Sequence, residues 1–313
     1  AYVAGRFRVF SPLTFEVGVR RDRQTLTGEA ETSPRVNLAW APGDRSVLRA
    51  GWGRLHQPQG INELQIEDGV LDFFPAQRAE RWEVDFNHLF AGGLKLGVSA
   101  YVKSMTRLRP RYENLFNPIQ LFPEAEPDRV RIVSGRAVAR GVEIELGMDR
   151  GRPLSWRASY ALASAQDQVD GAWVPRSWDQ RHTLSLSLNY RRGEKWDVSL
   201  AGVFHTGWPT TDVRAVQVQN PDGSLVIQPI LGPRNGLRYP SYHRLDLKVT
   251  RRFELDGGTL GLYLDVTNLY DRDNVCCVQD FQYLPQADGS VRIDRTEGYW
   301  LRQVPVVGLT WDF

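Results

Sequence analysis

The residue types that could build an enzyme or metal site are present, but their spacing assembles neither. The five histidines are scattered, and no pair has the separation of zinc ligands; they are His56, His88, His182, His205 and His243. Asp271 and Asp273 lack the further acidic positions of a calcium loop, so a solvated turn is favoured. No phosphate-binding glycine loop or hydrolase-type serine elbow is present. We expect no enzymatic activity, no cofactor and no metal.

The two cysteines are adjacent, at positions 276 and 277. This spacing fits no metal-binding motif. In an exported protein, Cys276 and Cys277 form either a strained vicinal disulfide or two free thiols. The rarity of such bridges favours a loop turn without a redox role.

Arginine and aromatic residues between the regular segments suit the binding of a small molecule. A guanidinium group binds carboxylates through paired hydrogen bonds and stacks on rings, which favours an anionic or aromatic ligand. For each residue the alternative role is to brace one loop against another. If the alternation of the expected strand 93–106 continued beyond its end, Arg107, Arg109 and Arg111 would lie on one face. The candidates are Arg107, Arg109, Arg111, Tyr112, Trp173, Arg176, Trp178 and Trp208.

The elements that must position these residues are all β-strands. The hydrophobic pattern has a period of two and shows no helical segment. The expected strands cover residues 2–10, 13–21, 34–41, 46–55, 78–90, 93–106, 135–148, 154–166, 180–191, 196–207, 241–254, 258–270 and 300–313.

Several of these segments have one apolar face and one polar face, because a strand points successive side chains in opposite directions. Residues 184–190 alternate leucine or tyrosine with serine or asparagine, and residues 142–148 alternate aliphatic residues with glutamate or glycine. A carboxylate facing lipid costs on the order of a few kcal/mol. We therefore expect Glu143 and Glu145 to line a hydrated interior.

The connections between the expected strands alternate in length. The short ones are turns rich in Gly, Pro and Asp, at residues 11–12, 42–45, 91–93, 149–153, 192–195 and 256–257. The long ones cover residues 22–33, 56–77, 107–134, 167–179, 208–240 and 271–299. Tight turns at one end and long loops at the other are typical of an outer-membrane β-barrel, with short periplasmic turns and long extracellular loops.

Composition agrees with this interpretation. No stretch approaches the roughly 18 apolar residues of a transmembrane helix, but a barrel strand needs only about 9–11 residues with one apolar face. The formal net charge is +2, which gives no reason to expect a nucleic-acid partner. Aromatic residues gather near the short turns, as in the girdle of a barrel at the membrane surface.

The final segment, residues 303–313, alternates apolar and small or polar residues and ends on Phe313. This pattern predicts the closing strand of an outer-membrane barrel. An odd count of about 13 strands that ends in the periplasm must begin outside, so we expect strands and an export signal upstream.

Several motifs resemble those of TonB-dependent outer-membrane receptors. Residues 140–145, RGVEIE, are similar to the family's RGxE strand, and residues 204–211, FHTGWPTT, to its TGxPxT strand exit. Residues 242–249, YHRLDLKV, and 262–270, LYLDVTNLY, resemble its penultimate hairpin, which ends in NLY or NLF. Phe313 is similar to the terminal aromatic residue that the barrel-assembly machinery reads as an assembly signal.

The resemblance implies an all-β, antiparallel, up-and-down transmembrane β-barrel of about 22 strands, of which residues 1–313 supply the C-terminal portion. It implies an integral protein of the Gram-negative outer membrane, in contact with its lipid. It also implies TonB-energised uptake of a scarce nutrient, such as a siderophore-like metal chelate or another small-molecule ligand. The TonB complex would act through an N-terminal plug region that this sequence does not contain.

Two alternatives remain. A passive porin-like or structural barrel would have further strands upstream and no plug. A soluble secreted β-protein would bury leucines such as Leu186 in a water-excluded core.

Overall fold

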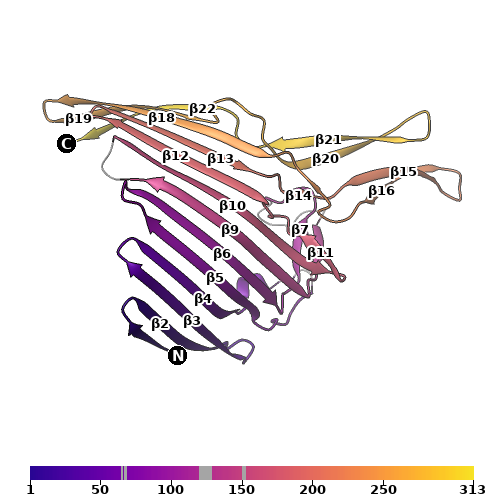
Figure 1. Ribbon diagram of the computed structural model, residues 1–313. Coiled ribbons are helices and arrows are strands. Elements are labelled where there is room, and N and C mark those ends of the chain that lie inside the picture. Colours follow the sequence, from indigo (N-terminus) through magenta and orange to yellow (C-terminus); the bar gives the residue numbers. More distant parts are fainter. Residues whose placement is uncertain (65, 67–68, 120–128, 150–152) are drawn as a thin grey trace. The chain divides into compact units, whose positions relative to one another are not determined.

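The computed structural model (Figure 1) describes residues 1–64, 66, 69–119, 129–149 and 153–313. The chain divides into two compact units. Unit 1 comprises Ala1–Arg111, Ile132–Arg150 and Arg157–Trp173. Unit 2 comprises Tyr112–Arg131, Gly151–Trp156 and Val174–Phe313. Among the described residues, no helix has the length and apolar character needed to cross a membrane.

Unit 1 is an antiparallel sheet whose strands follow one another in chain order. The order is β1 (Tyr2–Phe10), β2 (Leu13–Arg23), β3 (Ala30–Gly43), β4 (Ser46–Gln57), β5 (Gln77–Leu89), β6 (Leu94–Thr106), β9 (Arg136–Met148) and β10 (Leu154–Val169). The short β11 (Ala172–Pro175) pairs with β10, and the 3-10 turn η1 (Ile61–Glu63) lies between β4 and β5.

Unit 2 has the same up-and-down arrangement. Its long strands are β12 (His182–Arg192), β13 (Trp196–His205), β18 (Tyr242–Leu255), β19 (Gly258–Thr267) and β22 (Val304–Asp312), in that order. The connections carry four two-stranded pairs: β7 (Arg111–Asn114) with β8 (Arg129–Ile132), β14 (Pro209–Thr210) with β17 (Leu237–Arg238), β15 (Val213–Gln219) with β16 (Leu225–Leu231), and β20 (Val275–Pro285) with β21 (Val291–Tyr299).

Each expected strand corresponds to one of these long strands, so the expected fold is confirmed. The structure differs in the connections, to which the sequence analysis assigned no strands. The ladder between β2 and β3 continues to the pair Arg23 and Ala30, through most of the expected loop 22–33. Backbone hydrogen bonds sustain this extension, because a strand above the apolar zone needs no apolar face. The expected turn 149–153 lies partly outside the described residues.

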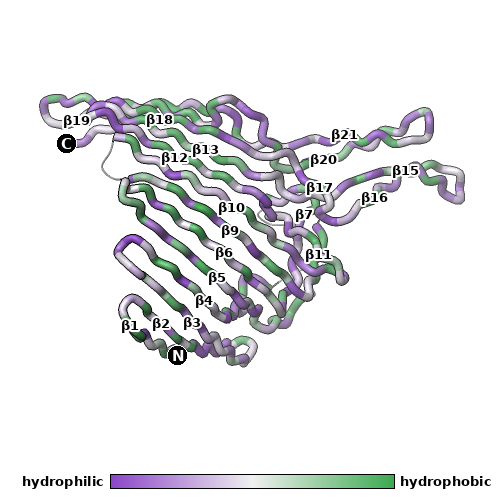
Figure 2. Tube along the Cα trace, viewed as in Figure 1, coloured by the Kyte–Doolittle hydropathy of each residue, from purple (hydrophilic) through white to green (hydrophobic). Residues whose placement is uncertain are grey.

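The register sorts unit 1 into one apolar face and one polar face. Two neighbouring rows on the apolar face are Trp40–Leu48–Phe86–Val98–Ile144 and Leu38–Ala50–Val84–Ala100–Val142. The row Ala39–Arg49–Asp85–Ser99–Glu143 lies on the opposite face. Figure 2 shows the alternation as green and purple segments along β4, β5, β6 and β9.

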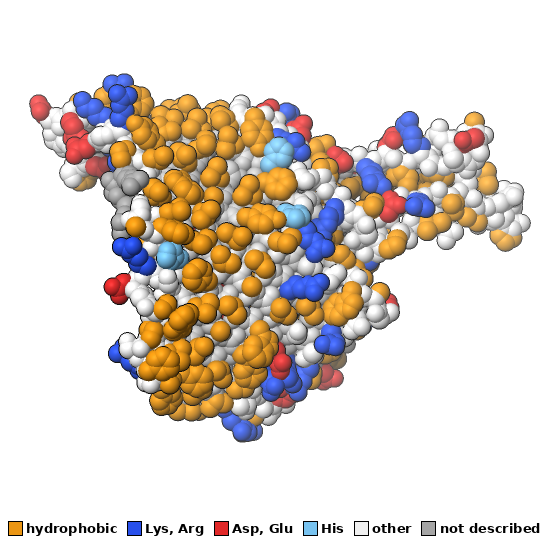
Figure 3. Space-filling view, in the orientation of Figure 1, with side chains coloured by type: hydrophobic (Ala, Val, Ile, Leu, Met, Phe, Trp, Pro, Cys, Tyr) orange, Lys and Arg blue, Asp and Glu red, His pale blue; other side chains and the backbone are white. Residues whose placement is uncertain are grey.

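The apolar face remains exposed, with Trp82, Val84 and Phe86 among its exposed large side chains. Figure 3 shows hydrophobic side chains spread over the middle of the strands. A contiguous exposed apolar surface of this kind requires lipid or another partner to cover it. The polar face carries Glu143 and Glu145, as expected, and Glu145 lies 3.4 Å from Arg157.

Candidate ligand-binding site at the loop ends of the strands

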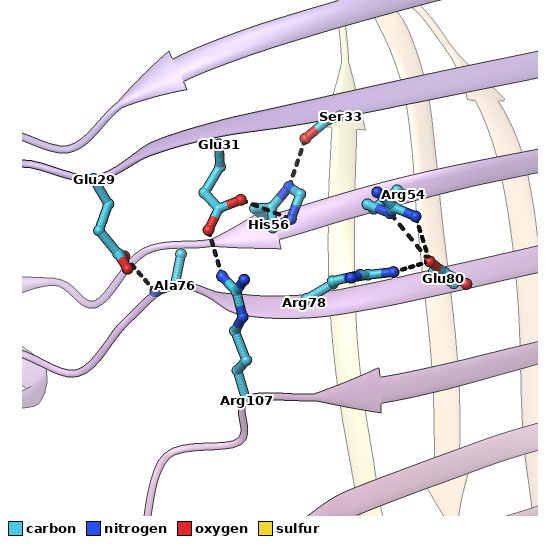
Figure 4. A network of polar contacts seen from close by, with 9 residues as sticks. All are labelled: Glu29, Glu31, Ser33, Arg54, His56, Ala76, Arg78, Glu80 and Arg107. Atoms are coloured by element: carbon cyan, nitrogen blue, oxygen red, sulfur yellow. Dashed lines mark hydrogen bonds and ion pairs between the residues drawn. The ribbon is translucent and has the colours of Figure 1, made fainter.

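The three candidate arginines of unit 1 each pair with a carboxylate from a different segment. Arg107 lies 2.5 Å from Glu31, and Arg109 lies 2.8 Å from Glu63. Arg111 lies 2.5 Å from Asp167, whose side chain is fully buried. These contacts tie the segment after β6 to β3, to η1 and to β10, and Figure 4 shows the first of them.

The alternation expected through these arginines does not continue. Strand β6 ends at Thr106, and Arg107 takes a left-handed conformation with φ of 54°. That conformation turns the chain and ends the two-residue period before Arg109 and Arg111. The prediction that strand alternation places these three arginines on one face is therefore wrong.

The remaining candidates divide between the two units. Trp173, in β11 of unit 1, is exposed. In unit 2, Tyr112 lies beneath the guanidinium of Arg129, 4.9 Å from its ring centroid, and the carbonyl of Arg176 accepts a hydrogen bond from the amide of Asp179. Phe313 follows β22 and is fully exposed.

Trp178 and Trp208 belong to an aromatic cluster in unit 2, which also contains His205, Tyr242 and Trp300. The ring of Trp208 lies 5.7 Å from Trp178, 5.8 Å from His205 and 5.9 Å from Trp300, between centroids. His205 stacks on Tyr242 at 4.8 Å. The five residues form one continuous set of ring contacts.

The register places this aromatic cluster on the polar face of unit 2. His205 and Tyr242 are direct partners in the ladder of β13 and β18. On these two strands Ser199 and Asp246 share their parity, whereas Leu245 and Leu247 have the opposite parity. The cluster therefore lies at the loop end of the face that points away from the apolar surface.

Glycine at position 207 allows the chain to bring Trp208 into the cluster. A Cβ atom at Gly207 would lie 1.7 Å from the carbonyl oxygen of Tyr239, which no side chain permits. The close approach lets the amide of Tyr239 donate to the carbonyl of Trp208 at 3.0 Å. The expected strand exit around this glycine is thus a point where the two ends of the connection between β13 and β18 meet.

One ion pair and several hydrogen bonds hold the loop that presents Trp178. Arg238 pairs with the carboxylate of Asp179 and donates to the carbonyl oxygens of Asp179 at 2.8 Å and Gly207 at 3.0 Å. The hydroxyl of Ser177 donates to Glu113 at 2.7 Å. Ser177 and Asp179 are 5% and 4% exposed, whereas Trp178 between them is 55% exposed. The loop thus presents one accessible indole on a fixed backbone.

Tyr239 ties the loop that contains Phe116 to the connection between β13 and β18. The hydroxyl of Tyr239 donates to the carbonyl of Phe116 at 2.6 Å, and Thr210 donates to that hydroxyl at 3.2 Å. Burial raises the pKa of Tyr239 to about 12, against the opposing effect of the Thr210 hydrogen bond. Tyr239 is therefore a neutral donor at physiological pH.

Two other predictions concern residues near β20. Cys276 and Cys277 are buried free thiols within this strand. The prediction that they lie in a loop turn is therefore wrong. Burial, aided by the neighbouring Cys276, raises the pKa of the Cys277 thiol to about 12. Asp271 and Asp273 each lie 3.0 Å from Arg302.

Sequence reasoning found two members of the aromatic cluster and missed His205, Tyr242 and Trp300. A signal for two of them was present. His205 and Tyr242 have polar-face parity in strands that were correctly placed, and both stand at a loop end. Trp300 had no such signal, because its position depends on the β20–β21 hairpin that precedes it.

The sequence model of the family described as "TonB dependent receptor-like, beta-barrel" matches residues 1–269. A comparison with curated protein sequences found no match. Comparison with solved structures found many similar folds.

Three of these structures illustrate the likeness. The ferripyoverdine receptor of the outer membrane of Pseudomonas aeruginosa is 17% identical with a TM-score of 0.60, over 100% of this chain and 38% of the receptor. The FrpB iron transporter from Neisseria meningitidis is 14% identical with a TM-score of 0.60, over 100% and 44%. A mutant of the ferric enterobactin receptor of Pseudomonas aeruginosa is 14% identical with a TM-score of 0.64, over 100% and 44%. The chain thus spans less than half the length of these receptors.

Proposed function

Because the chain belongs to the TonB dependent receptor-like β-barrel family, we propose that residues 1–313 form the C-terminal portion of the barrel of a nutrient receptor. Members of this family are integral β-barrels of the Gram-negative outer membrane and are not enzymes. The exposed apolar face of the sheet is the surface that such a barrel presents to lipid. A soluble secreted β-protein is therefore excluded.

The proposed cargo is a bulky, scarce nutrient such as a siderophore-like metal chelate. The observation that carries this proposal is the aromatic cluster, which presents Trp178 on the polar face at the loop end of unit 2. Flat aromatic and anionic chelates bind indole rings and nearby arginines through stacking and charge. The structures of similar fold include receptors bound to, or named for, ferric chelates.

The arginine and aromatic candidates take two different parts in this proposal. We assign Trp178 and Trp208 to ligand contact, because they lie together on the polar face. We assign Arg107, Arg109 and Arg111 to holding the loops, because each is already paired with a carboxylate. Energy for uptake would come from the TonB complex through a plug region, and assembly would use Phe313.

A passive porin-like barrel is the second candidate. It fits the polar face of unit 1, which contains a hollow of about 510 Å³ lined by side chains such as Arg49, Glu83 and Asp85. A water-filled passage needs no presented aromatic ring. The rigidly held Trp178 therefore favours the receptor.

Binding by the full-length protein tests the proposal. Purified protein is titrated with ferripyoverdine, ferric enterobactin and ferric citrate, and tryptophan fluorescence reports binding. We expect saturable binding of at least one chelate, weakened at least tenfold by Trp178→Ala. The control is Trp40→Ala, which removes an exposed tryptophan from the apolar face of unit 1. Saturable binding of none of the chelates, or equal loss in both variants, contradicts the proposal.

A further inference from the structure

The two cysteines of unit 2 point to the same side of the hairpin that β20 and β21 form (Figure 1), although successive residues of a regular strand point to opposite sides. The register explains the exception. Val275 pairs with Tyr299 and Cys277 pairs with Gly298, so Cys276 is an extra residue on β20. Such a β-bulge redirects a side chain. Here it turns Cys276 toward the side to which Cys277 already points.

Gly298 on β21 leaves room for both sulfur atoms. A Cβ atom at this position would lie 2.7 Å from Sγ of Cys277 and 3.1 Å from Sγ of Cys276. Any other residue at 298 would therefore displace a thiol. The two thiols also contact each other through a hydrogen bond. The bulge and the glycine thus bring two soft donor atoms together in one small hollow.

The backbone on both sides of the cysteine pair is held in place. After the pair, the amide of Val278 donates to the carbonyl of Phe116 at 2.9 Å. Before it, the carbonyl of Asn274 accepts from the amide of Trp300 at 2.9 Å. The side chain of Asn274 also exchanges two hydrogen bonds with the backbone of His243, both at 3.0 Å. Little ordering energy is therefore lost when a ligand binds the two sulfur atoms.

The number of donor groups indicates which metal ion the hollow suits. Thiolates select soft ions such as copper(I) and zinc. Structural zinc needs four ligands, whereas among the described residues no cluster of three or more His, Cys, Asp or Glu side chains is placed to hold a metal ion. Copper(I) has a filled d shell and accepts two sulfur ligands in a linear arrangement. The pair therefore favours copper(I) over zinc.

The surroundings of the pair support a thiolate and give it access to solvent. The backbone amide of Gly298 donates a hydrogen bond to the sulfur of Cys277, which favours the charged form. The side-chain nitrogen of Gln279 lies 3.2 Å from the same Cβ position, and Gln279 is exposed. The hollow is thus reached from solvent beside Gln279, although both cysteines are largely buried.

We propose that Cys276 and Cys277 form a two-coordinate binding site for copper(I). Each thiol releases its proton to solvent as its sulfur binds the ion, and neither copper nor sulfur changes its oxidation state. The product is a copper bis-thiolate with a single negative charge. This site is separate from the aromatic cluster and does not depend on which nutrient the barrel transports. The bound ion cross-links the bulge and holds this end of the β20–β21 hairpin.

The test uses the purified full-length protein under anaerobic conditions, in competition with the coloured copper(I) chelator bicinchoninate. We expect the protein to withdraw a copper(I) ion that the variant Cys276→Ser with Cys277→Ser does not withdraw. Affinity in that variant should fall at least about 100-fold, because removing groups that only support metal ligands already costs about 10–100-fold. Gly298→Ala keeps both thiols but places a Cβ atom against them, and should weaken binding about 10-fold.

The matched control is Gly135→Ala, because a Cβ atom there meets nothing within 4 Å. We expect it to bind copper(I) as the unmodified protein does, and circular dichroism verifies the sheet in every variant. Equal withdrawal of copper(I) by the double serine variant and the unmodified protein would overturn the proposal. Tight binding of zinc by the same two thiols would overturn the two-coordinate assignment. A disulfide between Cys276 and Cys277 in protein isolated from cells would overturn the proposal as well, because neither sulfur could then bind the ion.

Discussion

The indole of Trp178 meets the indole of Trp208 edge to face, with centroids 5.7 Å apart and planes at 77°. Such a contact contributes about 0.5–1.5 kcal/mol beyond the area that it buries. Together with the ion pair of Arg238 and Asp179, it fixes an exposed ring on the polar face. A ligand that binds there meets a surface already in place, so little ordering energy is lost on binding.

The apolar face can be tested at the middle of β12. Leu186→Arg places a charge on the face that meets lipid. It should reduce the stability of the protein folded in vesicles, measured as its free energy of unfolding, by about 2–4 kcal/mol. Ser185→Arg is the control, because it alters the neighbouring residue on the polar face and should cost far less. Urea titration of both variants in vesicles measures the difference. Equal costs would mean that the faces are assigned incorrectly.

The loop scaffold can be tested at Arg234, which pairs with the carboxylate of Glu113. Both side chains are largely buried, so Arg234→Ala removes a guanidinium group from a buried carboxylate and should cost about 3–5 kcal/mol. Hydrogen exchange in residues 208–240 measures the loss. Arg214→Ala removes an exposed partner of Asp212 and should change little. If both variants leave exchange unchanged, the buried pair does not hold the loop.

Acid should loosen the turn at Glu63. The amide of Gly60 donates to this carboxylate at 2.7 Å, and this bond, together with Arg109, lowers the pKa of Glu63. The carboxylate therefore stabilises the turn above the unfolded-state pKa of about 4.3. That stability is lost as the pH falls through the lower folded-state pKa. Limited proteolysis within residues 57–77 should accelerate in this range, whereas Glu63→Gln should be cut readily at every pH. An unchanged pH profile in Glu63→Gln would remove Glu63 as the cause.

The buried thiols should resist alkylation. Because the pKa of Cys277 is raised to about 12, almost none of its reactive thiolate is present at pH 8. Iodoacetamide should label Cys276 and Cys277 slowly in the folded protein and rapidly in denaturant, as mass spectrometry will show. Rapid labelling of both residues in the folded protein would contradict their burial in β20.

The sequence predicted the strands well because their signal is local. Alternation along β12 or β9 depends only on one face meeting lipid and the other meeting water. The hairpin of β15 and β16 was missed, although Asn220, Pro221, Asp222 and Gly223 form a turn signal between two apolar runs. Its strands belong to a long connection, where length had been taken to indicate a loop.

The site was harder to predict because its residues meet through tertiary contacts. Trp178 and Trp208 were found by residue type alone. The pairing of Arg111 with Asp167 and of Arg234 with Glu113 joins segments far apart in the chain, and no local pattern announces it. Arginine in a loop therefore predicted a charged group nearby, but not whether that group belongs to a ligand or to the protein.

The most direct test of the proposed receptor is energy-dependent uptake by cells that produce the full-length protein. Uptake of radioactive iron is measured with ferripyoverdine, ferric enterobactin and ferric citrate, in cells with and without a working TonB complex. We expect one chelate to be taken up only when TonB works, and more slowly by the Trp178→Ala variant. Uptake that persists without TonB, together with free passage of small sugars, would identify a passive barrel and contradict the account.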